Sequence, residues 1–401
     1  MFSFTKKLDP NLRDILKFND KKNYRVLIKY KNSQDSISRK INSYKGVVVR
    51  KIESCNIICA KLNSKGIQRL LEYPEIEFIC FDRYLTLCGM SVQTGNKIKI
   101  SNKSGLSGTN LSVGVIDSGV YPHKDLTLPI NRISTFVDLI NNLSYPYDDN
   151  GHGTCTCGII AGNGISSNNM YSGVAPNCHI HCFKAFDKLG KGFVSDVLFS
   201  LQELINMSEK YNIKVICMPF ESLYYDSFIY NAFNTLFIKA INQSIIPILP
   251  SGSSKNVDDS ILGICLSKNC LTISGIDTTS EAKSYTYSSC GSIKKDNKPD
   301  FCAACVNIIS LNCNTSYLSE KDSIKIYAPK LETSYKEFTG TSIAAAYISA
   351  LCALLFEYNP TLKFDDIVSL LKVASTEIEI PKNQQGNGTI NINKIINTKK
   401  G

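Results

Sequence analysis

The first 90 residues combine short alternating apolar segments with two amphipathic ones. Residues 24–30 (Y-R-V-L-I-K-Y) alternate apolar and polar side chains, which predicts a half-buried strand. Three more strands and two helices are predicted, the strands at residues 46–50, 56–62 and 75–80 and the helices at 35–42 and 64–72. The resulting order, β-α-β-β-α-β, is typical of a split βαβ unit. We therefore predict a small α+β domain over residues 23–87, preceded by a helical extension over residues 1–22.

Residues 111–398 show a different pattern, in which short apolar strands alternate with longer helices. The predicted strands lie at residues 112–116, 179–183, 214–218, 245–249 and 271–276. The predicted helices lie at residues 194–211, 227–243, 342–357 and 364–374. This alternation predicts the α/β class, with a doubly wound, mostly parallel sheet that carries helices on both faces. Residues 88–110 are rich in Ser, Gly, Asn and Lys and are interpreted as a linker.

Composition narrows the class of protein. The chain has 401 residues, of which 43% are hydrophobic and 20% charged, as in a folded globular protein. The formal net charge is +10, but the lysines are scattered, so no nucleic-acid partner is expected. Residues 1–19 have no continuous apolar core, and the apolar segment 343–356 is too short to span a bilayer. We therefore expect a cytoplasmic protein without a membrane partner.

The 16 cysteines are interpreted as reduced thiols, because many lie inside apolar runs of a long chain without a secretion signal. Two clusters leave structural zinc open as an alternative. The first is C-H-I-H-C at residues 178–182, and the second is C-A-A-C at residues 302–305. A strand would divide the first cluster between two faces, and the second lacks a partner pair, so no metal ligand is predicted.

Three residues fit an activated serine nucleophile. Asp117 follows the predicted strand at residues 112–116, where the active groups of parallel sheets gather. His152 lies between two glycines, and Ser342 opens a long apolar helix whose N-terminus favours developing negative charge. A serine hydroxyl attacks when an imidazole takes its proton and a carboxylate orients the imidazole. We predict Asp117, His152 and Ser342 as catalytic residues, although Ser342 alone would be interpreted as a helix cap.

Six motifs in this order resemble those of the subtilisin-like serine proteases, and most closely the intracellular AprX-like branch. They are V-G-V-I-D-S-G at 113–119, Y-P-H-K-D-L at 121–126, Y-D-D-N-G-H-G-T at 147–154, G-V-A-P at 173–176, P-D at 299–300 with V-N-I-I-S at 306–310, and G-T-S-I-A at 340–344. Asp first, His second and Ser last is the order of subtilisin. The resemblance implies a subtilisin-like fold over residues 111–398. It also implies that residues 23–87 are a propeptide inhibitor domain, with an unrelated accessory domain as the alternative.

The sequence departs from the family where the substrate is held. Family members carry an Asn that donates to the oxyanion, and Ser253 stands at that position, after Ser251 and Gly252. The family's Ser-Leu-Gly edge, which pairs with an extended substrate, corresponds to Pro219, Phe220 and Glu221. Proline removes one N–H from this edge. By resemblance, Ser253 is the predicted oxyanion donor and the other five residues are predicted to bind substrate.

The resulting prediction is a serine endopeptidase that cleaves proteins or peptides through an acyl-enzyme on Ser342, slowed by the altered oxyanion hole. Its own N-terminal domain is the second expected partner. The alternative is a catalytically weak pseudoprotease that acts as a binding or signalling module, and a highly selective processing protease is a third hypothesis. Calcium is common in the family, but no carboxylate cluster here has clear calcium spacing, so no cofactor is predicted.

Overall fold

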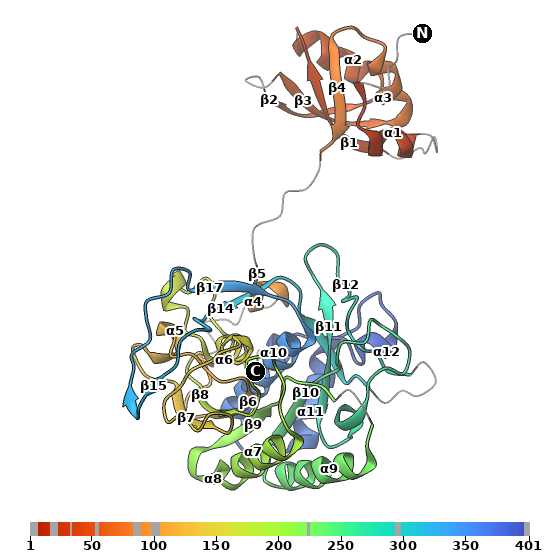
Figure 1. The fold of residues 1–401 in the computed structure, drawn as a ribbon. Coiled ribbons are helices and arrows are strands. Elements are labelled where there is room, and N and C mark those ends of the chain that lie inside the picture. Colours follow the sequence, from red (N-terminus) through yellow and green to blue (C-terminus); the bar gives the residue numbers. More distant parts are fainter. Residues whose placement is uncertain are drawn as a thin grey trace. The chain divides into compact units, whose positions relative to one another are not determined.

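The computed structural model describes residues 7–16, 23–32, 34–52, 56–82, 90–97, 105–222, 225–292 and 298–396. The chain divides into two compact units, Met1–Thr86 and Leu87–Gly401, each of which has its own hydrophobic core (Figure 1).

The N-terminal unit is a four-stranded antiparallel sheet covered by helices. Its strands, in the order β2-β3-β1-β4, are β1 (Asn23–Tyr30), β2 (Val47–Ile52), β3 (Ile57–Asn63) and β4 (Ile76–Phe81). Its helices are α1 (Pro10–Leu16), α2 (Gln34–Ser43) and α3 (Ser64–Leu71). The predicted order of strands and helices is therefore the observed one.

Helix α1 belongs to this N-terminal unit and does not form a separate extension. Leu12 and Leu16 are buried in the same core as Val26 and Ile28 of the central strand β1. Apolar side chains at positions 12 and 16 lie one above the other on a helix, which explains how so short a helix packs on the sheet. The rest of the predicted extension, residues 1–6 and 17–22, lies outside the described residues.

The C-terminal unit is built on a large sheet of order β18-β19-β13-β11-β10-β9-β6-β8-β7, to which β12 is added beside β11. The strands of this sheet are β6 (Ser112–Asp117), β7 (Ile133–Asp138), β8 (His179–Lys184), β9 (Ile213–Cys217), β10 (Ile246–Pro250), β11 (Leu271–Asp277), β12 (Lys283–Ser284), β13 (Phe301–Ala304), β18 (Ser375–Thr376) and β19 (Thr389–Ile390). Neighbouring strands from β7 to β19 run parallel, while β12 and β18 are antiparallel. The predicted mostly parallel sheet is confirmed.

Smaller elements complete this unit. The remaining strands are β5 (Met90–Ser91), β14 (Ile308–Leu311), β15 (Glu320–Lys321), β16 (Ile324–Lys325) and β17 (Tyr335–Phe338). The helices are α4 (Val92–Gly95), α5 (Lys124–Thr127), α6 (His152–Ala161), α7 (Val194–Asn206), α8 (Ser208–Tyr211), α9 (Ser227–Asn242), α10 (Thr341–Tyr358), α11 (Phe364–Ala374), α12 (Lys382–Gln385) and α13 (Asn393–Ile396), with 3₁₀ turns at Ile165–Ser167 and Gly263–Leu266. The helix predicted at 194–211 is thus divided into α7 and α8 at Met207.

Helices cover both faces of the large sheet, because alternate side chains of its strands point to opposite sides. Val113 and Val115 of β6 join the core that contains α6, α10 and α11, whereas Ile116 joins the core that contains α7 and α9. Among the described residues, α10 alone is long and apolar enough to cross a membrane, and 83% of it is buried inside the structure. It is the central helix of its core.

The structure differs from the predicted linker at residues 90–97. Strand β5 pairs in parallel with β14, and the following helix α4 buries Val92. The side-chain oxygen of Asn96 accepts a hydrogen bond from the N–H of Ala304, at 2.9 Å. Backbone and side-chain amide hydrogen bonds therefore hold this polar segment. Because such bonds require no hydrophobic periodicity, the sequence pattern did not indicate an ordered element here. Residues 88–89 and 98–104 of the predicted linker lie outside the described residues.

Candidate active site

Asp117, His152 and Ser342 lie in one hydrogen-bonded line. Nδ1 of His152 is 2.8 Å from Oδ1 of Asp117, and Nε2 is 3.0 Å from Oγ of Ser342. Because a carboxylate can only accept, Nδ1 carries the proton and Nε2 is left to accept the serine proton. Asp117 is 4% exposed and His152 37%, so the carboxylate is buried while the imidazole is open to a substrate. In this arrangement an imidazole can take a proton from a serine.

The local fold places His152 at the first position of α6, directly over the end of β6. Asp117 ends β6, and its carboxylate also accepts hydrogen bonds from the N–H of Ser118 and the hydroxyl of Thr156. A side chain at Gly153 would place its Cβ 2.0 Å from the carbonyl oxygen of Gly119. The glycine after the histidine therefore allows α6 to approach the loop that follows Asp117.

Asp148 fixes the start of α6 and was not assigned a role from the sequence. Its carboxylate is fully buried and accepts from the hydroxyl of Ser118, from the N–H groups of Asn150 and Gly151, and from both the N–H and hydroxyl of Thr154. These bonds use donors that the first turn of a helix leaves without partners. The pair of aspartates just before the histidine was the signal in the sequence.

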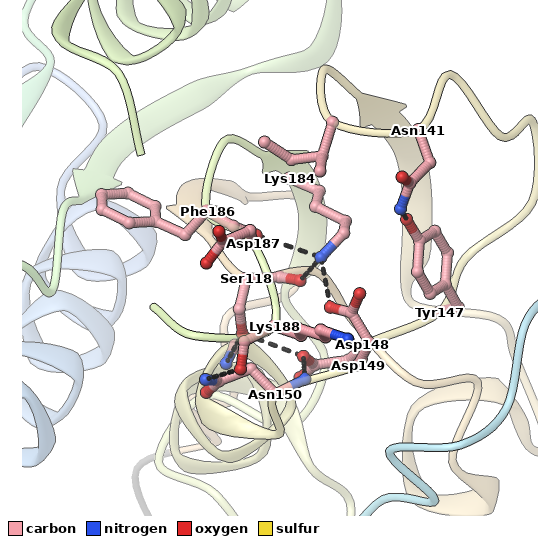
Figure 2. A network of polar contacts seen from close by, with 12 residues as sticks. Ser118, Asn141, Tyr147, Asp148, Asp149, Asn150, Lys184, Phe186, Asp187 and Lys188 are labelled. Carbon is pink, nitrogen blue, oxygen red and sulfur yellow. Dashed lines mark hydrogen bonds and ion pairs between the residues drawn. The ribbon is translucent and has the colours of Figure 1, made fainter. Parts of the chain in front are cut away.

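Lys184 is the second positioning residue that sequence reasoning missed. It is fully buried, and Figure 2 shows its Nζ between the carbonyl of Ser118 and the carboxylate of Asp149, each at 2.6 Å. Nζ also donates to the carbonyl of Phe186, at 3.0 Å. Because Lys184 pairs in register with Asp117 on the neighbouring strand, it ties the loop after Asp117 to the loop before His152. The feature of the sequence that could have indicated this role is a lysine at the end of an apolar strand.

Asp117 controls the charge of the imidazole. Burial lowers the pKa of His152, but the negative charge of Asp117 and the hydrogen bond to its carboxylate raise it more, so the pKa lies above the usual value of 6.5. The protonated imidazole of His152 is thus stabilised. Burial lowers the pKa of each of the other three histidines, His123, His179 and His181.

The hydroxyl of Ser253 is engaged by Glu221. The carboxylate of Glu221 accepts from the N–H of Ser253 at 2.8 Å and, through its other oxygen, from the Ser253 hydroxyl. Ser342 is the second residue of α10, where a backbone N–H has no acceptor within the helix. The arrangement therefore offers one fixed donor, the N–H of Ser342, and one donor that is bonded elsewhere.

Four of the five predicted substrate-binding residues line the cleft, and the fifth, Ser251, does not. Pro219, Phe220, Glu221 and Gly252 line a cavity of about 290 Å³ together with His152, Ser253 and Ser342. The N–H of Phe220 donates to the carbonyl of Met218, at 2.9 Å, so it is not available to a peptide that pairs with this edge. Ser251 differs from the prediction: it is buried, and its hydroxyl is 3.1 Å from that of Ser288. Side chains on a strand end alternate, which directs Ser251 to the core.

Within the described ranges, no group of three or more His, Cys, Asp or Glu side chains is arranged to hold a metal ion. This includes the two cysteine clusters singled out in the sequence.

Comparison with known proteins identifies the family. The profile of the subtilase family, peptidase S8, matches residues 108–388, which is more than half of the chain. The chain belongs to the subtilase family. The matched residues include Asp117, His152 and Ser342 and nearly all of the large sheet.

Individual subtilases show how far the similarity extends. Serine protease AprX of Bacillus subtilis (strain 168) is 30% identical over 284 residues, which cover 68% of this chain and 63% of AprX, less than two thirds of that protein. Subtilisin E of the same strain is 25% identical over 360 residues, covering 86% of this chain and 83% of subtilisin E. The solved structure of sphericase matches with a TM-score of 0.61 and 18% identity, over 77% of this chain and 100% of sphericase, which shows the shared fold.

Replacing Lys184 by methionine should lower the free energy of unfolding by about 3–5 kcal/mol. The change leaves the carboxylate of Asp149 and the carbonyls of Ser118 and Phe186 without this donor, and removing one partner of a buried ion pair has this cost. Urea denaturation followed by circular dichroism measures it. Lys188→Met, an exposed position on the same loop, should stay within about 0.5 kcal/mol of wild type. A Lys184→Met protein as stable as this control would contradict the role of Lys184.

The four histidines should differ in pKa, with one value above 6.5 and three below it. NMR titration of the Cε1 protons in Ser342→Ala should give His152 a pKa above 6.5 and the other three values below it. Because the folded pKa of His152 is raised, its interaction with Asp117 adds stability below pH 6.5 that is lost as the pH rises through the folded pKa. In Asp117→Asn the charge of Asp117 is lost while burial still lowers the pKa, so the pKa of His152 should fall; an unchanged pKa would show that Asp117 is not the cause.

Proposed function

We propose that this chain is a cytoplasmic serine endopeptidase that hydrolyses peptide bonds in proteins or peptides. The observation that carries the proposal is the continuous hydrogen-bonded line from Asp117 through His152 to Ser342. Membership of the subtilase family, in which the similar proteins AprX and subtilisin E are a serine protease and a subtilisin, supports it.

In the proposed reaction, Oγ of Ser342 bonds to the carbonyl carbon of the substrate while its proton passes to Nε2 of His152. The negative charge that forms on the carbonyl oxygen is held by the N–H of Ser342 at the start of α10. The C–N bond then breaks, and the proton on Nε2 goes to the leaving amine. Water then bonds to the acyl carbon and gives a proton to Nε2. The C–O bond to Ser342 breaks, the proton on Nε2 returns to Oγ, and the acid is released.

The N-terminal unit and the cysteines add two parts to the proposal. A four-stranded antiparallel sheet with helices supports the role of an inhibitory propeptide for Met1–Thr86. All 14 cysteines in the described part of the chain are free thiols, and 12 of them are buried, which supports a reducing compartment. No cofactor enters the proposed reaction.

Wild-type protein should react with a fluorophosphonate probe, whereas Ser342→Ala should not. The probe labels a serine that a neighbouring imidazole activates, and alanine removes the hydroxyl. Intact mass spectrometry gives a second readout: wild type should be shortened by cleavage within residues 88–110, and Ser342→Ala should keep the full 44.4 kDa. Because the N-terminal unit is the proposed inhibitor, labelling is also measured on a chain that begins at residue 88. Absence of labelling in that chain would argue against the endopeptidase.

A second function, that of a binding module with little or no hydrolysis, is favoured by two observations. The hydroxyl of Ser253 donates to Glu221, and the N–H of Phe220 is used within its own turn. Both reduce the donors available to a substrate and its oxyanion. The triad geometry favours the endopeptidase over this alternative.

Replacing Ser253 by asparagine separates the two functions. An amide reaches further than a hydroxyl and presents two donors, so kcat on a peptide amide with leucine at P1 should rise about tenfold or more; one oxyanion donor contributes about 10²–10³ in kcat. Ser254→Asn, one residue further along the loop, is the matched control and should leave kcat unchanged. If Ser253→Asn remains without activity while folded, the binding module is favoured.

A further inference from the structure

Glu221 brings a carboxylate into the proposed substrate cleft. Its two oxygens accept from the N–H and the hydroxyl of Ser253, so the side chain lies across the loop that holds Ser253. A Cβ on Gly252 would be 2.5 Å from Oε2 of Glu221, and the φ of Gly252 is +107°. Only a glycine backbone therefore leaves room for the carboxylate at this place.

Glu221 places a negative charge in the smaller cavity of the cleft. Glu221 lines the cavity of about 290 Å³ that holds Ser342 and Ser253, and it also lines the adjoining cavity of about 440 Å³ that holds Asp117 and His152. Among the described residues that line the smaller cavity, it is the only carboxylate, and the others are His152 and neutral side chains. A side chain that enters this cavity meets one carboxylate, the imidazole of His152 and otherwise neutral side chains.

The substrate residue that meets Glu221 follows from the chemistry. The attacked carbonyl carbon must lie about 3 Å from Oγ of Ser342, with its oxygen toward the donors. The residue that supplies this carbonyl, P1, is thus held beside Ser342. The smaller cavity is lined by both Ser342 and Ser253, so it is the space open to the P1 side chain.

We propose that Glu221 makes the enzyme selective for lysine or arginine at P1; this rests on the proposed endopeptidase function. A P1 ammonium or guanidinium forms charge-assisted hydrogen bonds with the carboxylate, and the planar guanidinium matches its two oxygens. A neutral P1 side chain would desolvate the carboxylate without supplying a cation, which is costly. The selected substrates are therefore proteins with a basic residue before the cleaved bond.

The same contact also positions Ser253. In the free protein, the hydroxyl of Ser253 donates to one oxygen of Glu221. When a P1 cation donates to that oxygen, the hydroxyl is released and can turn to the oxyanion. Glu221 is thus a specificity residue through P1 and a positioning residue through Ser253. The preference for basic P1 should consequently appear in kcat as well as in KM.

The test uses fluorogenic peptide amides that differ only in P1: arginine, lysine or leucine. Wild type should cleave the basic substrates with kcat/KM at least about tenfold above leucine, the effect of one charge-assisted contact. Glu221→Gln, which keeps the shape and removes the charge, should reduce this ratio to below about threefold, with part of the loss in kcat. Glu209→Gln on α8 removes one exposed carboxylate outside the cleft and should keep the wild-type ratio.

A binding measurement tests Glu221 without turnover. Isothermal titration of Ser342→Ala should show benzamidine, a cation of P1 size, binding at least about tenfold more weakly after Glu221→Gln. Neutral benzyl alcohol should bind both proteins equally. The proposal would be overturned if wild type cleaved the leucine substrate as well as the arginine substrate. It would also be overturned if Glu221→Gln left the affinity for benzamidine unchanged.

Failure of this proposal can be told from failure of the endopeptidase. If a fluorophosphonate labels Ser342 but the protein shows no preference for basic P1 residues, the proposed function stands and this inference fails. Protein that is not labelled loses the proposed function, and the benzamidine titration then decides whether Glu221 forms a cation site.

Discussion

The parallel register between β6 and β8 is the constraint on which the site depends. It brings Asp117 and Lys184, two charged residues at the ends of adjacent buried strands, side by side at the carboxyl edge of the sheet. Asp117 faces the imidazole, while Lys184 holds the carbonyl of Ser118 and the carboxylate of Asp149. The loop that follows Asp117 and the loop that precedes His152 are therefore fixed by one buried cation. Such a network is rigid only because each of its groups has a partner.

The groups that position the triad are held by several hydrogen bonds, whereas the edge that faces the substrate has few free backbone donors. Asp148 uses both carboxylate oxygens to hold the start of α6, so the position of His152 is determined by several hydrogen bonds at once. On the substrate side, Pro219 has no N–H and that of Phe220 is used locally. An extended peptide therefore finds fewer backbone donors along this edge, and side-chain contacts must supply more of its binding.

Sequence reasoning predicted the parts of this structure that depend on local pattern. The strands at residues 112–116 and 179–183 follow from apolar runs, and the triad follows from residue types at strand and helix ends. Contacts between distant residues have no local signature. The bond between Glu221 and Ser253 joins residues 32 positions apart, and the burial of Ser251 depends on which side of a strand end faces the core. Residues 90–97 were misassigned for the same reason, since β5 is held by β14, more than 200 residues away.

The two departures from the family, at positions 221 and 253, are explained better together than apart. A carboxylate at position 221 needs donors, because a partly buried charge without them is costly. The short side chain of Ser253 provides one donor and leaves space for the carboxylate above Gly252. A glycine at position 221 would leave the hydroxyl of Ser253 without its acceptor. In the proposed endopeptidase, the pair forms a unit that exchanges a permanent oxyanion donor for a charge in the cleft. Such an exchange favours catalysis when the substrate itself brings the opposite charge.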